Sequence, residues 1–453
     1  MTGSANHTLD SARFTGPVFT PDHPGYAEEI AGFQTAYAHR PALVVGAVHA
    51  EDVRAAVEYA ARQGLPVAVQ ATGHGLSVAA DGGVLITTGR MDTITVDPRA
   101  RTARIGAGVR AGALIEVAAR HGLAPLNGSS LSVGVTGYVL GGGLGLLARE
   151  FGYAADRVRS IDLVTADGRM RTLVPGDELF GAVLGTGGNF GVVTGLELEL
   201  VAVTELYGGQ LMFDTDQVDE ALDAWRQWTA TLPDALTSGI AVLTFPDIAP
   251  VPQPLRGRHV ASIRIAFDGP AEEGERLVAP LRAIGDRIRD DLRAMPYTES
   301  HTIYSDPDVP HAYAATNALV ADLTPATLSA LRAQTAPGGP VDAVIDIRHL
   351  GGALRRGDGI AVDHRDAEYV VRVITGVGAG DRTPTGLTVI REALAPWTIG
   401  HSLNFVYGAG ADANAAQTAA GYAPETYARL RALKSKYDPH SMFRLNRAIA
   451  PAE

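Results

Sequence analysis

The first 200 residues alternate between short apolar runs and amphipathic segments. The apolar runs at 41–48, 66–70 and 84–88 are typical of buried strands, which commonly span about four to eight residues. Between the first two runs, residues 50–64 repeat apolar side chains at helical spacing, which predicts a helix. This alternation predicts an α/β unit over the first part of the chain.

The remainder of that unit is predicted from the same signals. Short strands are expected at 93–96 and 102–105, followed by a helix from about 110 to 120. The stretch IDLVTADGRMRTLV predicts a hairpin with Asp167 and Gly168 at its turn. A short helix in DELFGAVL and a buried strand in FGVVTGLELELV complete the unit.

Beyond residue 200 the predicted elements become longer. Long strands are expected at 239–245, 259–267 and 341–350. Helices are expected at 218–232, 271–289 and 424–436. This order predicts a second domain of the α+β class, followed by a C-terminal segment.

Composition limits the kind of protein. A chain of 453 residues exceeds one ordinary core, which favours two domains. The formal net charge of −12, without a basic block, argues against a nucleic-acid partner. No apolar run reaches the roughly 18 residues of a membrane span. We therefore expect a small-molecule partner, with no nucleic acid and no membrane.

The chain has no cysteine, which excludes a disulfide framework and thiolate metal ligands. The histidines form no H-E-x-x-H pattern, so no metal site is expected. The N-terminus lacks the basic start and apolar stretch of a signal peptide, and the expected location is the cytoplasm.

Glycine is concentrated in two places. Five glycines fall among residues 137–145 (GYVLGGGLG) and five among 185–195 (GTGGNFGVVTG). Backbone N–H groups in such segments can hold a diphosphate without a lysine, although a pair of tight turns is the alternative. A third motif, ATGHG at 71–75, places His74 between glycines directly after a predicted strand.

Two familiar motifs are rejected. Gly106, Gly108 and Gly112 resemble a dinucleotide fingerprint, but the region that should supply its acidic residue, GLAPLNGSSLSVG, contains none. A hydrolase is disfavoured because the chain has no G-x-S-x-G elbow.

Taken in order, several segments resemble the berberine bridge enzyme-like flavoproteins of the vanillyl-alcohol oxidase superfamily, which include 6-hydroxynicotine oxidases and actinobacterial biosynthetic oxidases. The similar segments are RPALVVGAVHAEDV, ATGHG, GVTGYVLGGGLGLLAREFG, DRVRSIDLVTADG, GGNFGVVT, HLGGA and LKSKYDPHSMFRLN. The resemblance covers nearly the whole chain and implies a flavoprotein with bound FAD.

The resemblance also implies how FAD is held. In the family, the histidine matching His74 bonds covalently to the 8α carbon of FAD. A second link through cysteine is common, but Ser130 stands at that position, so a single link through His74 is expected. The expected cofactor contacts are Thr72, Gly73, His74, Gly75, Leu76, Ser77, Ser130, Gly134, Val135, Gly137, Gly141, Gly142, Asn189, Gly191, Val193, Asn404 and Asn446.

The implied fold class is α+β, with a two-domain PCMH-type FAD-binding architecture. Residues 1–200 are expected to form the FAD-binding domain, and 396–453 to return to it as a C-terminal segment. Residues 201–395 are expected to form a substrate domain, with a curved antiparallel sheet backed by helices.

The candidate catalytic residues are Tyr138, Asp346, Arg348 and Tyr407. Alternation along the predicted strand 341–350 places Asp342, Asp346 and Arg348 on one face, which is either a cavity wall or a solvated face with an Asp–Arg pair. Tyr138 matches a tyrosine of related biosynthetic oxidases. The family's Y-x-N-Y tail is SLNFVYG here, so Phe405 replaces a tyrosine and Tyr407 is a substitute.

Three functions remain open at this stage. The first is an FAD-linked oxidase of secondary metabolism that oxidises an alcohol, amine or ring carbon and reduces O₂ to H₂O₂. The second is a flavin dehydrogenase with another acceptor, and the third is a flavin-containing cyclase with no net redox. The chain is expected to be a monomer or a homodimer.

Overall fold

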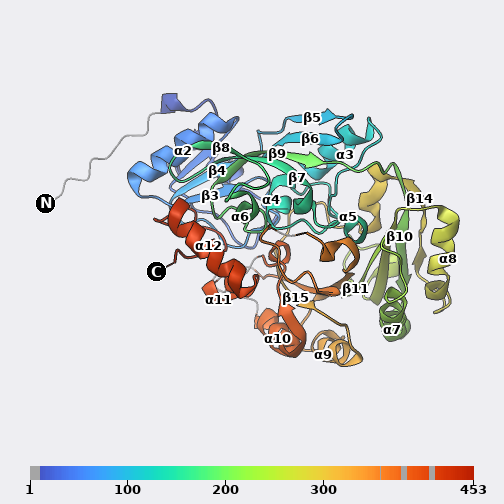
Figure 1. Ribbon diagram of the computed structural model, residues 1–453. Coiled ribbons are helices and arrows are strands. Elements are labelled where there is room, and N and C mark those ends of the chain that lie inside the picture. Colours follow the sequence, from blue (N-terminus) through green and yellow to red (C-terminus); the bar gives the residue numbers. More distant parts are fainter. Residues whose placement is uncertain (1–10, 358, 379–384, 408–413, 453) are drawn as a thin grey trace.

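The computed structural model describes residues 11–357, 359–378, 385–407 and 414–452. Two sheets of the first 200 residues lie in the upper part of Figure 1, and a third, larger sheet lies below and to the right. The last helix, α12 (Pro424–Tyr437), lies beside the first half of the chain, as Figure 1 shows in red.

The first sheet has four strands in the order β1-β2-β4-β3. Their bounds are β1 (Val18–Phe19), β2 (Leu43–Gly46), β3 (Val67–Gln70) and β4 (Val84–Thr87). β2 and β3 both run parallel to β4. Helix α2 (Ala50–Gln63) connects β2 with β3, and it ends at Gly64, whose φ of 65° suits a residue without a side chain. The strands and helix predicted here are confirmed.

The second sheet is antiparallel, in the order β5-β6-β9-β7-β8. Its strands are β5 (Ile94–Asp97), β6 (Thr102–Gly106), β7 (Val158–Val164), β8 (Met170–Leu173) and β9 (Val192–Glu199). The predicted hairpin turn is confirmed between β7 and β8, where Gly168 has a φ of 74°. Since β6 has only antiparallel neighbours, the glycines after it do not open a parallel dinucleotide-binding unit.

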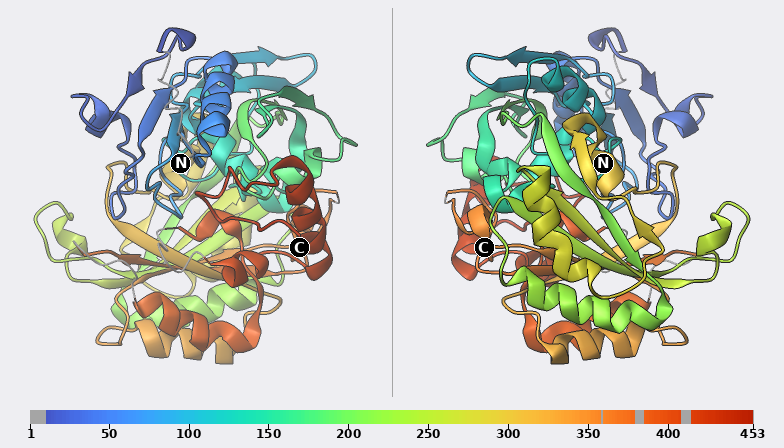
Figure 2. Two further views of the ribbon diagram at one scale, coloured as in Figure 1. Left: turned by 90° about the vertical axis from the view of Figure 1, so that its left-hand side faces the viewer. Right: turned by 90° about the vertical axis from the view of Figure 1, so that its right-hand side faces the viewer.

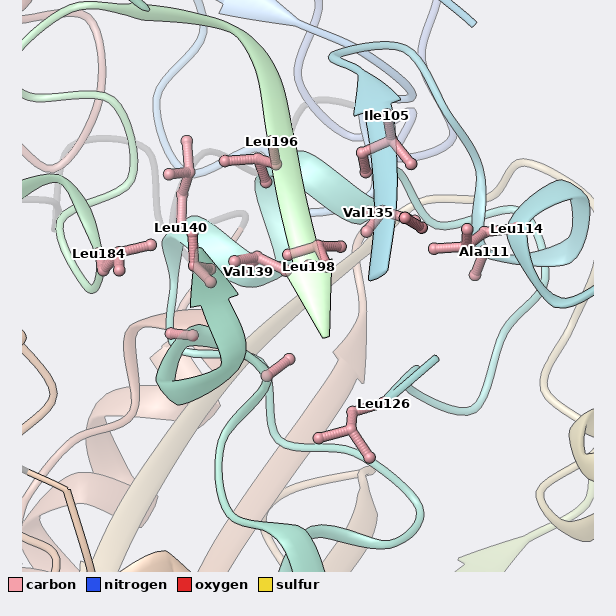
Figure 3. Close-up of a cluster of buried hydrophobic side chains, with 14 of the residues drawn as sticks. Ile105, Ala111, Leu114, Leu126, Val135, Val139, Leu140, Leu184, Leu196 and Leu198 are labelled. Carbon is pink, nitrogen blue, oxygen red and sulfur yellow. The ribbon is translucent and has the colours of Figure 1, made fainter. Parts of the chain in front are cut away.

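Helices α3 (Ala111–Ala119) and α4 (Val135–Leu140) pack on this second sheet. Figure 3 shows Val135, Val139 and Leu140 of α4 close to Leu196 and Leu198 of β9. Burying these side chains fixes α4, and with it the first glycine-rich segment, against a rigid support.

The third sheet is antiparallel and has nine strands. It runs in the order β13-β10-β12-β11-β16-β17-β15-β18, with β14 also paired to β10. Its strands are β10 (Glu205–Phe213), β11 (Leu236–Thr244), β12 (His259–Phe267), β13 (Arg289–Asp290), β14 (Arg293–Pro296), β15 (Tyr313–Val320), β16 (Val344–His349), β17 (Tyr369–Gly376) and β18 (Thr398–Gly400).

Four helices cover one face of the third sheet; the green, orange and red-orange ones lie along the bottom of Figure 2, and the yellow one lies higher, beside the strands, in the right-hand view. They are α7 (Val218–Thr229), α8 (Ala271–Arg282), α9 (Pro325–Thr335) and α10 (Thr385–Leu394). The opposite face of the sheet is therefore free to face the first half of the chain. The remaining α-helices are α1 (Tyr26–Glu29), α5 (Ala148–Phe151), α6 (Phe180–Val183) and α11 (Ala415–Ala419).

Two predicted elements are shorter than expected. The helix predicted to reach residue 289 ends at Arg282, because Arg289 and Asp290 instead pair with β10 as a strand. The strand predicted from 341 begins at Val344, which leaves Asp342 exposed and outside the strand. Both differences arise from pairing with distant segments. Within the described part of the chain, no helix has the length and apolarity to cross a membrane.

The tail is attached to the first half by a buried ion pair. Lys434 of α12 donates from Nζ to Asp438 at 2.7 Å and to the carbonyl oxygen of Asn189 at 2.7 Å. Asp438 also accepts from the backbone N–H groups of Met442 and Phe443. Lys434 and Asp438 are fully buried, so each charge depends on the other for stabilisation.

Replacing Lys434 with methionine leaves the Asp438 charge buried without its partner. We expect the free energy of unfolding, measured in guanidinium chloride, to fall by about 3–5 kcal/mol. The matched control is Lys436→Met on the same helix, which removes an exposed pair with Glu178 and should cost at most about 1 kcal/mol. Equal effects of the two substitutions would contradict the structural role of Lys434.

Candidate active site

A cavity of about 470 Å³ lies where the first half, the third sheet and the tail meet. Residues 71–78, the first glycine-rich segment and the loop before β9 line it from the first half. Residues of β16 and β17 line it from the third sheet, and segments 403–407 and 445–447 line it from the tail. Three parts of the chain that are far apart in sequence therefore form one site.

His74 lies in this cavity, in the loop that follows β3. Its ring stacks on Phe33, with centroids 3.7 Å apart and an angle of 14° between the planes. The preceding residue, Gly73, has a φ of 72°, and a side chain there would come within 2.6 Å of the Cα of Gly32. The loop therefore requires glycine at position 73 to bring His74 and Phe33 together.

Among the described residues, Nε2 of the imidazole has a hydrogen-bond partner and Nδ1 has none. Nε2 of His74 lies 2.8 Å from Oγ of Ser132, which lies 3.0 Å from Oγ of Ser130. Burial lowers the pKa of His74 to about 4, and the positive charge of Arg110 adds to this effect. The ring is therefore neutral at neutral pH, and a tautomer with the proton on Nε2 leaves a lone pair on Nδ1.

The glycine-rich segments expose their backbone to the cavity. A side chain at Gly137, Gly187 or Gly188 would meet no atom within 4 Å, so these positions face open space. At Gly141, in contrast, a Cβ would lie 1.7 Å from Oδ1 of Asn404. The tail is thus packed against the first segment, while both segments leave room for a ligand.

Several buried polar atoms in the cavity wall have no hydrogen-bond partner among the described residues. They are Oγ1 of Thr136, Oδ1 of Asn446 and Nη2 of Arg447. Burial, together with the positive charge of nearby Arg391, lowers the pKa of Arg447 to about 10. Unpaired buried donors and acceptors are costly, so they indicate that a polar ligand completes this wall. A buried cation beside open glycine backbone suits the diphosphate of FAD.

Most of the predicted cofactor contacts line the cavity. Those that do so are Thr72, Gly73, His74, Gly75, Leu76, Ser77, Ser130, Gly134, Gly137, Gly141, Gly191, Val193, Asn404 and Asn446. Val135, Gly142 and Asn189 lie outside the lining. Asn189 is fully buried, and its side chain bonds the backbone of Thr186, Arg447 and Ile449, so it joins the glycine-rich loop to the tail.

The predicted catalytic residues are divided. Tyr138, Arg348 and Tyr407 line the cavity, whereas Asp346 does not. Asp346 is 1% exposed and lies within 3.3 Å of three arginines, so the face of β16 is buried rather than solvated. Burial opposes ionisation of Asp346, but the three guanidinium groups prevail and hold its pKa at about 2. Such a carboxylate is a poor proton acceptor.

The two tyrosines are also constrained. Tyr138 donates its hydroxyl hydrogen bond to the carbonyl oxygen of Leu126 at 3.1 Å, and burial raises its pKa. Burial likewise raises the pKa of Tyr407, although Arg372 and Arg348 lower it. Neither phenol is readily ionised, so neither is suited to act alone as a base near neutral pH.

Several residues of the cavity wall carry no signal in the sequence that marks them as site residues. They are Asp306, His311, Tyr313, Arg372 and Arg447. Asp306 is the one carboxylate in the lining among the described residues, and it accepts a hydrogen bond from Ser129. It lies in a proline-bearing loop without regular structure, where no periodic pattern marks an inward-facing side chain.

The sequence is similar to those of known FAD-binding proteins, as the cavity suggests. A family model described as an FAD binding domain matches residues 41–173. The chain is 29% identical to (R)-6-hydroxynicotine oxidase of Paenarthrobacter nicotinovorans, over 96% of this chain and 97% of that protein. It is 25% identical to an FAD-linked oxidoreductase of Bacillus subtilis, YgaK, over 98% of each.

Solved structures of the same fold are also similar. The crystal structure of 6-hydroxy-D-nicotine oxidase from Arthrobacter nicotinovorans matches with a TM-score of 0.82 and 26% identity, over 97% of this chain and 98% of that one. A xylooligosaccharide oxidase from Myceliophthora thermophila shares the fold with a TM-score of 0.83 at 21% identity, over 97% and 98% of the two chains. The BBE-like 1 protein of Physcomitrella patens does so with a TM-score of 0.81 at 18%, over 98% of each.

The matches extend over both halves and the tail, and the cavity has the glycine-rich walls and unpaired polar atoms that bound FAD requires. The chain is therefore an FAD-dependent oxidoreductase that carries an FAD binding domain and is similar over nearly its whole length to (R)-6-hydroxynicotine oxidase, whose fold it shares.

Proposed function

We propose that this enzyme is an oxidase whose FAD is bonded covalently to His74. The observation that supports this most directly is the state of the imidazole, which is neutral, stacked on Phe33 and held at Nε2 by Ser132. A neutral imidazole with a free Nδ1 is a nucleophile, and it lies in the cavity that suits the cofactor.

His74 would hold the cofactor through a bond from Nδ1 to the 8α carbon of FAD. Forming this bond would remove one hydrogen from the 8α carbon and the proton from Nε2 of His74, and the two electrons released would reduce the flavin until O₂ takes them to give H₂O₂. A thioether to a second residue is ruled out because the chain has no cysteine and Ser130 stands at the corresponding position. The cofactor is thus linked once.

The residues that line the cavity suggest which segments bind the cofactor and which bind the substrate. Residues 1–200 and 396–453 form the cofactor domain in this proposal, and 201–395 form the substrate domain. The glycine backbone at 134–141 and 187–191 and the buried guanidinium of Arg447 would hold the diphosphate and ribityl groups. Asn446 and Asn404 would contact the cofactor from the tail.

FAD, when bound, supplies the acceptor for a hydride and passes the electrons to O₂. The protein must receive the proton that the substrate loses from its O–H or N–H group. Asp306 is the proposed acceptor, because it is the carboxylate that lines the described cavity and is not paired with an arginine there. Tyr407 and Tyr138 would position the substrate rather than ionise.

The proposed substrate is a small alcohol or amine of secondary metabolism. The names of the relatives, a 6-hydroxynicotine oxidase and oligosaccharide oxidases, cover both chemical classes. The enzyme is proposed to act in the cytoplasm as a monomer or homodimer.

The covalent link predicts that the yellow flavin remains attached to denatured protein. After acid precipitation, the wild-type protein should stay yellow, and His74→Ala should release its flavin into the supernatant, where absorbance measures it. His311→Ala is the matched control, since His311 lines the same cavity and should leave the flavin attached. Release from the wild-type protein would refute the link while leaving FAD binding intact.

Oxygen reactivity can be tested without knowing the substrate. Protein reduced with dithionite under anaerobic conditions should, when mixed with aerated buffer, regain its colour faster than free reduced FAD and form one H₂O₂ per flavin. Recovery no faster than that of free FAD would indicate a dehydrogenase. Anaerobic bleaching by (R)-6-hydroxynicotine or xylobiose would identify a substrate, and product without bleaching would indicate a cyclase.

Asp306→Asn should lower kcat by a factor of about 10²–10⁴ for a substrate that bleaches the flavin, because the proton loses its acceptor. Asp306→Glu should restore part of the rate, because it returns a carboxylate to the same position. The control is Asp308→Asn, an exposed residue of the same loop, which should change kcat little. An unchanged kcat in Asp306→Asn would exclude this role.

A further inference from the structure

The third sheet presents a buried charge cluster on the face that its helices leave free. Asp346 on β16 lies opposite Arg372 on β17, and Arg348 lies two residues further along β16. On the other side, Gly239 of β11 lies between Arg348 and Arg264 of β12. Because paired residues and residues two apart share a face, all four charges lie on the same side of the sheet.

Gly239 is needed for this arrangement. A Cβ at position 239 would lie 2.9 Å from the carbonyl oxygen of Ile347 and 3.3 Å from the hydroxyl oxygen of Tyr304, so β11 can pair with β16 at this register only with glycine there. Arg264 and Arg348 flank Asp346 from β12 and β16, the strands on either side of β11. The cluster is thus arranged by strand register rather than by a flexible loop.

Three cations surround one anion. The carboxylate oxygens of Asp346 lie 3.0 Å from a guanidinium nitrogen of Arg264, 3.1 Å from one of Arg348 and 3.3 Å from one of Arg372. The side chains of these arginines are 12%, 7% and 14% exposed, in the same order. Asp306 lies close enough to Arg348 to interact with its charge. When both carboxylates are counted against the three arginines, the cluster still has one positive charge in excess. A buried, uncompensated guanidinium is costly.

Aromatic rings orient the arginines without neutralising them. The guanidinium of Arg348 lies between Tyr304, at 4.7 Å, and Phe405, at 5.1 Å, and that of Arg372 lies 4.9 Å from Phe405. Cation–π contacts of this kind stabilise a cation but leave its hydrogen-bond donors free in the plane of the group. Nε of Arg372 has no partner among the described residues.

Only two members of the cluster reach the cavity. Arg348 and Arg372 line it, whereas Arg264 and Asp346 lie behind them. We propose that Arg348 and Arg372 bind a carboxylate of the substrate, so that the substrate is an organic anion. Guanidinium groups suit carboxylates because their planar donors match the two oxygens. This inference rests on the proposed oxidase function and narrows its substrate class.

The test uses benzoate as the anionic probe and benzamide as its neutral counterpart of the same shape. Each is titrated into the flavin-bound protein at constant ionic strength, and the change in the visible flavin spectrum gives a Kd. We expect benzoate to bind at least about tenfold more tightly than benzamide, in line with a charged hydrogen bond. Equal affinities in the wild-type protein would overturn the proposal without any variant.

Variants locate the site. Arg348→Gln and Arg372→Gln should each weaken benzoate binding about tenfold and leave benzamide binding unchanged. Arg264→Gln is the matched control, because it removes a third contact to Asp346 but does not face the cavity, and it should change the Kd less than about threefold. If all three variants weaken benzoate binding equally, the loss reflects the removal of any one positive charge rather than of a specific contact, and the proposed site is refuted.

The flavin content of each preparation separates this proposal from the cofactor assignment. Folded Arg348→Gln or Arg372→Gln protein that has lost its flavin would show that these arginines hold the diphosphate of FAD, which overturns the proposal. Yellow wild-type protein that does not distinguish benzoate from benzamide would refute the anion site alone. Release of flavin from acid-treated wild-type protein would instead refute the covalent link.

Discussion

The ring of His74 packs against Phe33 and its Nε2 is hydrogen-bonded to Ser132, and burial is the largest influence on its protonation state. Water is excluded from one face by the aromatic ring, and the pKa of about 4 keeps the imidazole neutral. Everything proposed for the cofactor depends on this state, because a charged imidazole has no lone pair to offer a flavin. The rest of the first half holds this residue at the edge of a cavity.

The remaining walls are assembled from distant segments. Lys434 and Asp438 attach the tail, Asn189 joins it to the second glycine-rich loop, and Asn404 packs against the first. These contacts bury polar groups in pairs, so moving one segment would leave charges or amides without partners. The cavity is therefore a consequence of the closed fold as a whole rather than a property of any one domain.

Charge is distributed unevenly across this cavity. The first half contributes a neutral histidine and open backbone, whereas the third sheet contributes arginines that outnumber nearby carboxylates. Asp346, which the strand pattern predicted as a catalytic residue, is instead paired with three arginines behind the cavity wall. Asp306, which no pattern marked, is the carboxylate that reaches the cavity. Of these two carboxylates, only Asp306 is therefore placed where it could contact a ligand in the cavity.

The sequence alone determined the order and type of most elements in the first 200 residues, because apolar periodicity follows from which faces are buried. It also located His74 between glycines and the two glycine-rich segments, and it shows that no cysteine is present, since these features depend on local residue types. The tertiary structure decided which side chains converge. Strand register placed Arg264 and Arg372 beside Asp346, and long-range packing turned Asn189 away from the cavity and Asp306 toward it. Such contacts join residues far apart in the chain, and no local pattern records them.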